Sequence, residues 1–298
     1  MPSFVRPLNL KKPVVNRKLI AWGFILTGLV SLGSWAWGRW QIPANHSDAA
    51  NADKGEGGGF WGPVKITYTV APKSPPPMSS ETISALQKLL DSTSGKYGIY
   101  VYRLSDKLGY GISADKVLPA ASIMKVPIMV ATYRQIEAGK IQLADVEPLL
   151  EAIGKRSDNE APVTLTKMIG RPYIQQTLKD LGMHQSDFDQ NTTTAYDLAQ
   201  LWKTLYAGNL ITSEHWRQMQ QFLTDSIFEE RIPAGVPDEI QVVHKVGTDI
   251  NIWADSGIVM GAKPLVISIL NDQVDLAAAK EVVPQLVRVI WSAESANQ

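Results

Sequence analysis

Cysteine is absent from this chain of 298 residues. The absence excludes a disulfide framework, a thiolate nucleophile and a zinc site with cysteine ligands. Histidine is also scarce, and the four copies do not have the spacing of a metal site. We therefore expect neither a metal nor another cofactor, and we expect His244 to flank a strand. The other three histidines are His46, His184 and His215.

An excess of charge of either sign is missing as well. Lysine plus arginine and aspartate plus glutamate each number 29, so the formal net charge is zero. This balance gives no reason to expect nucleic acid as a partner. Hydrophobic residues make up 45% of the chain, which is enough for a sizeable core.

One long apolar run, residues 19–38, carries no charged residue and is rich in leucine, glycine and tryptophan. About 20 such residues can span a bilayer as a helix. Residues 1–18 are a basic tail without acidic residues, and this bias predicts a cytoplasmic N-terminus. We therefore expect a single-pass inner or plasma membrane protein, with everything after the anchor in the periplasm or outside the cell.

A cleaved signal peptide is the alternative interpretation of the same run. No small-x-small cleavage site follows it directly, and the candidate at residues 50–52 comes late. Residues 39–78 are rich in glycine and proline, which is typical of a linker. Residues 79–298 are then a single globular domain of ordinary size.

The hydrophobic pattern of this domain changes between the period of a strand and that of a helix. Strands are predicted near both ends, at 96–104, 108–113, 240–245, 251–259 and 264–270. Helices are predicted at the start from Ser80, at the end over 274–291, and between the strand groups at 128–137, 145–153, 161–169, 172–181, 196–206 and 213–223. Strands from both ends must pair to form a sheet. We therefore predict an α/β (α+β) fold, an antiparallel sheet flanked by terminal helices with an inserted all-helical lobe.

A serine and a lysine three residues apart, Ser122 and Lys125, stand where a helix is predicted to begin. Residues with this spacing share a helix face, so the lysine amine can reach the hydroxyl. The free N–H groups of a helix start suit a serine that becomes an alkoxide. A helix cap followed by a solvated lysine is the alternative interpretation.

Two further segments carry groups that acyl transfer needs. Ser157 and Asn159 lie in a loop between helices, where a hydroxyl can relay a proton and a carboxamide can hold a substrate amide. Lys245, Gly247 and Thr248 stand at the end of a predicted strand, where glycine allows close approach of a substrate backbone. An ordinary polar loop and an ordinary turn are the alternatives.

The three segments, in this order, resemble the penicillin-recognising serine hydrolases, and class A β-lactamases most closely. That family carries Ser-x-x-Lys, Ser-Asp-Asn and Lys-Thr-Gly in chain order. The resemblance extends from about residue 79 to residue 291. It implies a two-lobe β-lactamase-like fold and a serine hydrolase that works through an acyl-enzyme.

The resemblance also implies a role for each matching residue. Ser122 would be the nucleophile, Lys125 the base once its pKa is lowered, and Ser157 the group that passes a proton to the leaving nitrogen. Substrate would be bound by the residues Asn159, Lys245, Gly247, Thr248 and Arg231. The backbone N–H groups of Ser122 and Thr248 would form the oxyanion hole. A surface arginine is the alternative for Arg231.

Two departures from the family pattern bear on the reaction. Valine replaces the threonine of Lys-Thr-Gly at position 246, which removes a hydroxyl that would bind a carboxylate. The family also has a long Ω-shaped loop with a Glu-x-x-Leu-Asn signature, whose glutamate activates the deacylating water. Residues 183–191 here form a shorter segment without glutamate. Asp187 or Asp189 is a possible substitute, and a solvated turn is the other interpretation.

These features predict an enzyme that opens β-lactam or related amide bonds, with intact acylation and slow deacylation. A penicillin-binding D,D-peptidase acting on peptidoglycan stem peptides is one alternative, and an amidase or esterase for another small acyl substrate is a second. A non-catalytic module that binds peptidoglycan is a third. We expect a monomer whose partners are the small substrate and the membrane.

Overall fold

The computed structural model describes residues 80–295. The predicted basic tail, membrane anchor and linker, at 1–18, 19–38 and 39–78, lie outside the described residues and stay predictions. Among the helices of the described part, none combines the length and the apolarity that crossing a membrane requires.

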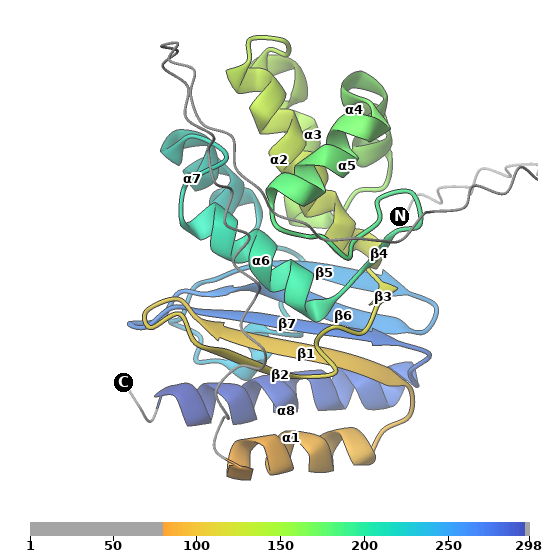
Figure 1. The fold of residues 1–298 in the computed structure, drawn as a ribbon, viewed down its shortest axis with the longest axis vertical. Coiled ribbons are helices and arrows are strands. Elements are labelled where there is room, and N and C mark those ends of the chain that lie inside the picture. The colour runs from red at the N-terminus through yellow and green to blue at the C-terminus, as the bar shows by residue number, and fades with distance from the viewer. Residues whose placement is uncertain (1–79, 296–298) are drawn as a thin grey trace, which may run out of the picture. The chain divides into compact units, whose positions relative to one another are not determined.

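The centre of the fold is a five-stranded antiparallel sheet with the order β2-β1-β7-β6-β5 (Figure 1). Its first strands, β1 (Lys96–Arg103) and β2 (Gly109–Ile112), come from the start of the domain. The strands β5 (Val242–Asp249), β6 (Ile252–Val259) and β7 (Leu265–Asp272) come from its end. Because β1 pairs with β7 along its whole length, the predicted meeting of the two ends is confirmed.

The two terminal helices, α1 (Ser80–Asp91) and α8 (Leu276–Ser295), cover one face of this sheet (Figure 1). They pack against each other, and their apolar sides meet the strands in one buried cluster. Leu86 of α1 and Leu286 of α8 belong to this cluster together with Ile99 of β1. The predicted position of the terminal helices on a single face is therefore confirmed.

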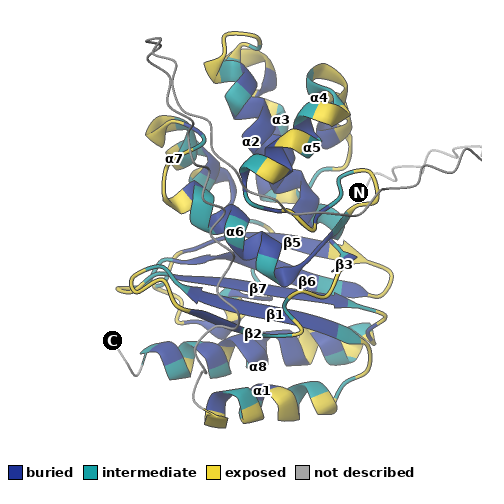
Figure 2. Cartoon of the chain, in the orientation of Figure 1, coloured by how far each residue is buried: buried dark blue, intermediate teal, exposed yellow. Residues whose placement is uncertain are grey.

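The opposite face carries the inserted helical lobe, whose interior is buried as Figure 2 shows. The lobe consists of α2 (Lys125–Glu137), α3 (Leu143–Arg156), α4 (Glu160–Ile169), α5 (Arg171–Asp180), α6 (Ala195–Tyr206) and α7 (Ser213–Phe222). Helix α6 lies directly on the sheet. Its Trp202 is fully buried and donates a hydrogen bond of 2.8 Å to Ser256 on β6.

Short elements that the sequence analysis did not predict connect the two lobes. Strand β3 (Leu118–Pro119) pairs with β4 (Thr192–Thr193), and a 3-10 turn, η1 (Ala121–Met124), leads into α2. A second 3-10 turn, η2 (Pro233–Gly235), precedes β5.

Two predicted boundaries differ from the structure. Gly154 does not end its helix, because α3 continues to Arg156. A side chain at Gly154 would lie 2.4 Å from the backbone oxygen of Phe222, so this glycine permits close helix packing. Strand β5 also continues beyond Lys245, which places the whole Lys245–Thr248 segment inside the strand rather than at its end.

Candidate active site

Ser122 lies in the turn η1, immediately before α2, and not in the first turn of the helix itself. The turn begins with Ala121 in the left-handed region, at φ 46°. It is held by a hydrogen bond of 2.9 Å from the Ala120 N–H to the carbonyl of Asn191, at the end of the short segment after α5. The nucleophile candidate is thus positioned by backbone contacts from two parts of the chain.

Lys125, the first residue of α2, points its amine at the loop between α3 and α4. Its Nζ donates to the Ser157 carbonyl at 2.7 Å, to the Asn159 Oδ1 at 2.8 Å and to the Ser157 Oγ at 3.4 Å. Burial lowers the pKa of Lys125 to about 8, and the nearby Asp158 carboxylate offsets part of this effect. The alternative interpretation of Lys125 as a solvated lysine is therefore wrong.

The loop residues take these positions for local reasons. Ser157 ends α3 in the left-handed conformation, with φ 53° and ψ 36°, which turns its carbonyl toward Lys125. Asp158 accepts hydrogen bonds from the backbone N–H groups of Glu160 and Ala161 and so caps the start of α4. The Ser-Asp-Asn segment therefore combines one helix cap with three hydrogen bonds from the lysine.

Strand β5 brings the third segment to the same place. At Gly247 the strand lies so close to η1 that a side chain there would meet the Ala120 carbonyl oxygen at 2.9 Å and Ile123 at 3.2 Å. Lys245, two residues earlier, is only 2% exposed. Burial lowers its pKa to about 7, and the positive charge of Lys125 lowers it further. The three predicted segments therefore converge on one place.

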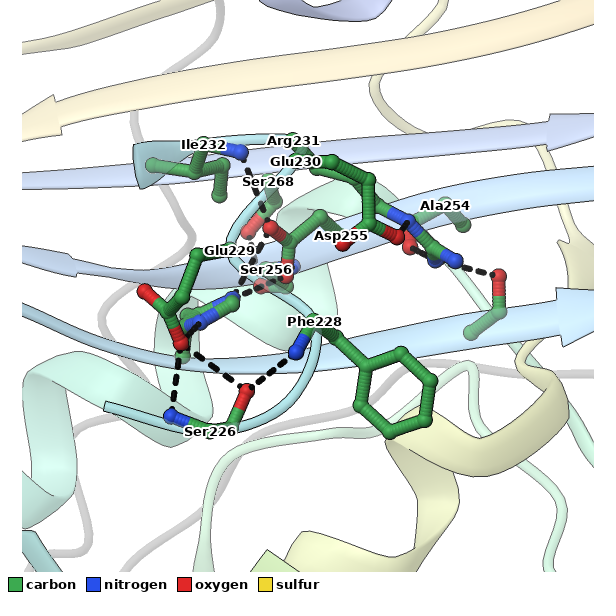
Figure 3. A network of polar contacts seen from close by, with 12 residues as sticks. Ser226, Phe228, Glu229, Glu230, Arg231, Ile232, Ala254, Asp255, Ser256 and Ser268 are labelled. Atoms are coloured by element: carbon green, nitrogen blue, oxygen red, sulfur yellow. Dashed lines mark hydrogen bonds and ion pairs between the residues drawn. The ribbon is translucent and has the colours of Figure 1, made fainter. Parts of the chain in front are cut away.

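Arg231, which lies just before η2, is fully buried against β5 and β6 (Figure 3). Its guanidinium donates to the carbonyls of Gly247 at 3.1 Å and Ala254 at 2.6 Å, and to the Thr248 hydroxyl at 2.6 Å. It also lies 3.7 Å from the centre of the Trp253 ring. The surface interpretation of Arg231 is wrong, and the residue fixes the hydroxyl of Thr248.

Behind these residues lies a buried ionic network that the sequence analysis did not find (Figure 3). His244 on β5 contacts the Asp255 carboxylate at 2.9 Å and Glu229 at 3.4 Å. Although burial opposes the charge, the two carboxylates raise the pKa of His244 to about 9. An aspartate in the middle of an apolar strand next to a strand histidine was the available signal. No group of potential metal ligands occurs among residues 80–295.

A pocket of about 580 Å³ opens beside the Ser122 turn. Ala121 and Lys125, on either side of Ser122 in the sequence, both line it. The other lining residues come from η1, α2, α4, the junction of α4 with α5 and the segment after α5, and they are Met124, Ile128, Pro162, Val163, Thr166, Lys167, Gly170, Arg171, Phe188 and Asn191. None of the described residues that line this pocket is acidic.

The two aspartates of the short segment are engaged elsewhere. Asp187 accepts a hydrogen bond of 2.9 Å from the Gln190 N–H within a turn. Asp189 is exposed and pairs with Arg171, whose guanidinium lies 5.0 Å from the centre of the Phe188 ring. The structure thus favours the interpretation of this segment as a solvated turn.

Comparison with known proteins agrees with this geometry. The sequence profile of a family described as the beta-lactamase enzyme family matches residues 81–148 and 144–293. No curated protein matches the chain. A β-lactamase from Xanthomonas campestris pv. campestris is 18% identical, with a TM-score of 0.68, and the match covers 72% of this chain and 97% of that one.

An ancestral enzyme gives a similar result. The class A β-lactamase of the last common ancestor of Gram-negative bacteria is 20% identical, with a TM-score of 0.68 and coverage of 72% of this chain and 100% of that one. The antiparallel sheet with its two sets of helices is therefore the class A β-lactamase fold. Since the family profile spans most of the sequence, the chain belongs to the beta-lactamase enzyme family.

Proposed function

We propose that this protein is a serine acyl-transfer hydrolase that opens β-lactam or related amide bonds through an acyl-enzyme at Ser122. The observation that carries the proposal is the position of Lys125, which is buried one turn after the nucleophile in the chain and is held by Ser157 and Asn159. An amine with a pKa of about 8 is neutral in a useful fraction of molecules near neutral pH.

In the proposed reaction, neutral Lys125 takes the Ser122 hydroxyl proton while the oxygen attacks the substrate carbonyl carbon. The carbon–nitrogen bond then breaks, and the leaving nitrogen receives a proton through Ser157. The backbone N–H groups of Ser122 and Thr248 stabilise the oxyanion. Asn159 holds the side-chain amide of the substrate.

The carboxylate of the substrate is bound on the β5 side of the site. Lys245 supplies a positive charge, and Gly247 lets the substrate backbone approach the strand. Thr248 supplies a hydroxyl that Arg231 orients, since its oxygen accepts from the guanidinium and its proton stays free to donate. The family motif provides a threonine hydroxyl at position 246, where this chain has valine. The hydroxyl of Thr248 replaces it in the proposed site.

Deacylation is proposed to be slow. Water that attacks an ester needs a base, and none of the described residues lining the pocket beside Lys125 is acidic. Asp187 and Asp189 make other contacts. The protein is further proposed to act as a monomer, anchored by residues 19–38 with its hydrolase domain outside the cytoplasm.

The proposal is tested with the full chain and a fluorescent penicillin. We expect a covalent adduct that maps to Ser122 by mass spectrometry and persists for minutes or longer. The Ser122→Ala variant should form no adduct, while Ser213→Ala, at the exposed start of α7, should label as the wild type does. If no penicillin or cephalosporin labels Ser122, the proposal is wrong.

A D,D-peptidase that acts on peptidoglycan stem peptides is the second candidate. The pocket lacks the carboxylate that would support rapid hydrolysis of β-lactams, which a D,D-peptidase does not need. The hydroxyl of Thr248 would bind the C-terminal carboxylate of a stem peptide. Release of D-alanine from a stem peptide would distinguish it from the first candidate. A non-catalytic peptidoglycan-binding module is disfavoured, because such a module has no need of two buried lysines.

A further inference from the structure

The pocket beside Lys125 is an open one, lined mainly by residues of α2, α4 and α5. These three helices pack on one another (Figure 1). Most of its lining is apolar, with Met124, Ile128, Pro162, Val163 and Phe188 as the main contributors. Its volume of about 580 Å³ falls within the range of about 300–1,000 Å³ that is typical of small-molecule sites. The pocket therefore has the size and chemistry of a ligand site rather than of a packing defect.

The position of the pocket defines which part of a substrate can reach it. Its lining includes Ala121 and Lys125, which flank the nucleophile in the sequence, and most of its other residues belong to the helical lobe. None of the β5 residues assigned to the carboxylate, Lys245, Gly247 and Thr248, lines it. In the proposed reaction, the substrate carboxylate is attached to the leaving nitrogen. The pocket therefore faces the other part of the substrate, the acyl group that becomes attached to Ser122.

Contacts between neighbouring side chains hold the walls of the pocket in place. Arg171 covers the Phe188 ring and is itself paired with Asp189. The Phe188 N–H donates to the Gln175 side chain at 2.8 Å, which ties the segment after α5 to that helix. The polar residues of the lining are Lys125, Thr166, Lys167, Arg171 and Asn191, and none of them carries a carboxylate.

We propose that this pocket binds the acyl group of the substrate and selects acyl donors with an extended apolar acyl chain. The inference rests on the proposed function and adds a substrate class to it. Each methylene group that leaves water contributes about 0.8 kcal/mol, or about fourfold in rate or affinity. An acyl chain of several carbons is therefore strongly preferred over an acetyl group.

The test compares p-nitrophenyl acetate with p-nitrophenyl hexanoate on the full chain, measuring the nitrophenolate burst and the mass of the Ser122 adduct. We expect the hexanoyl ester to acylate at least about tenfold faster. Val163→Phe should reduce this ratio to about twofold or less, because Val163 lines the pocket and is 47% exposed, so a larger side chain is tolerated there.

Met168→Phe is the matched control, since Met168 is 50% exposed on the same helix and does not line the pocket. It should keep the wild-type ratio. A second measurement avoids turnover: sodium octanoate should bind the Ser122→Ala variant in calorimetry. Adding Val163→Phe to that variant should weaken binding at least about tenfold.

The outcomes separate the two proposals. If penicillin labels Ser122 but the ester ratio is near one, or does not respond to Val163→Phe, the acyl pocket is wrong and the proposed function stands. If neither penicillin nor either ester labels Ser122, the proposed function fails and the pocket assignment fails with it.

Discussion

Two buried lysines with lowered pKa values belong to the candidate site, Lys125 at the start of α2 and Lys245 on β5. Lys125, with a pKa of about 8, becomes a base only when neutral, while Lys245, with a pKa of about 7, attracts a carboxylate only when charged. The two requirements oppose each other. Acylation by a carboxylate-bearing donor should therefore be fastest where both conditions are partly met, between about pH 7 and pH 8.

The pH dependence of acylation follows from this opposition. With a penicillin, the acylation rate constant should rise toward pH 7 and fall above pH 8. With a neutral p-nitrophenyl ester, only the rise through about pH 8 should remain, because no carboxylate needs Lys245. Stopped-flow measurements from pH 5.5 to 9.5 check both curves. Identical profiles for the two donors would contradict the assignment of Lys245.

At the residue scale, the sequence indicated the groups of the proposed chemistry but not the buried residues that contact them. Ser122, Lys125 and Lys245 stand in short motifs whose chemistry is local. The contacts of Arg231 depend on how far β5 runs, and those of His244 depend on its pairing with β6. Such long-range contacts leave only a faint trace in the sequence, here an aspartate within an apolar strand.

At the element scale, the distance between β5 and the turn η1 sets the width of the site. Gly247→Ala would place a methyl group 2.9 Å from the Ala120 carbonyl oxygen and push the two elements apart. We expect acylation by a penicillin to fall at least about tenfold, since a shift of about 1 Å can cost about 100-fold. Burst kinetics on folded protein, confirmed by circular dichroism, measure the effect.

Gly98→Ala on β1 is the matched control. Its methyl group would lie 3.2 Å from the Ser113 carbonyl oxygen, a milder crowding at a central strand that involves no residue of η1. This variant should lose stability and keep its acylation rate per folded molecule. Equal rates for Gly247→Ala and the wild type would show that the spacing of β5 and η1 is not critical.

Most helices and strands could be predicted because their hydrophobic periods are clear and their caps are local. Thr194 and Thr212 accept hydrogen bonds at the starts of α6 and α7, as their sequence positions indicate. Gly154 misled the prediction, since a glycine needed for close packing looks the same in a sequence as one that ends a helix. The two-residue strands β3 and β4 are too short to show a period.

At the scale of the whole molecule, the His244 network links folding to pH. The folded pKa of His244, about 9, lies above its ordinary value of 6.5. Its contribution to stability is therefore complete below pH 6.5 and is lost as pH rises through about 9. Lys125 and Lys245 act in the opposite direction, because lowered lysine pKa values make stability rise above pH 7.

The contribution of His244 can be measured as the difference in the free energy of unfolding between the wild type and a variant. The free energy of unfolding of His244→Gln should fall below that of the wild type at pH 6, since Asp255 loses its buried partner. This difference should shrink by about 2–3 kcal/mol between pH 6 and pH 10. Urea unfolding across this range measures it. A difference that stays constant with pH would mean that His244 is not charged in the folded state.

The overall architecture was predictable because strands from both ends of the domain have no partners other than one another. The pocket was not, since its walls come from three helices and one loop whose packing no local pattern records. The short segment after α5 contributes Phe188 and Asn191 to these walls, but its sequence does not indicate a pocket.

That brief segment also bears on how the molecule would be used. A protein that forms an ester quickly and hydrolyses it slowly removes acyl donors one for one, like a titrant. The amount of acyl donor removed would then equal the amount of protein present, and each acylated molecule would persist as a stable marker of exposure to the donor.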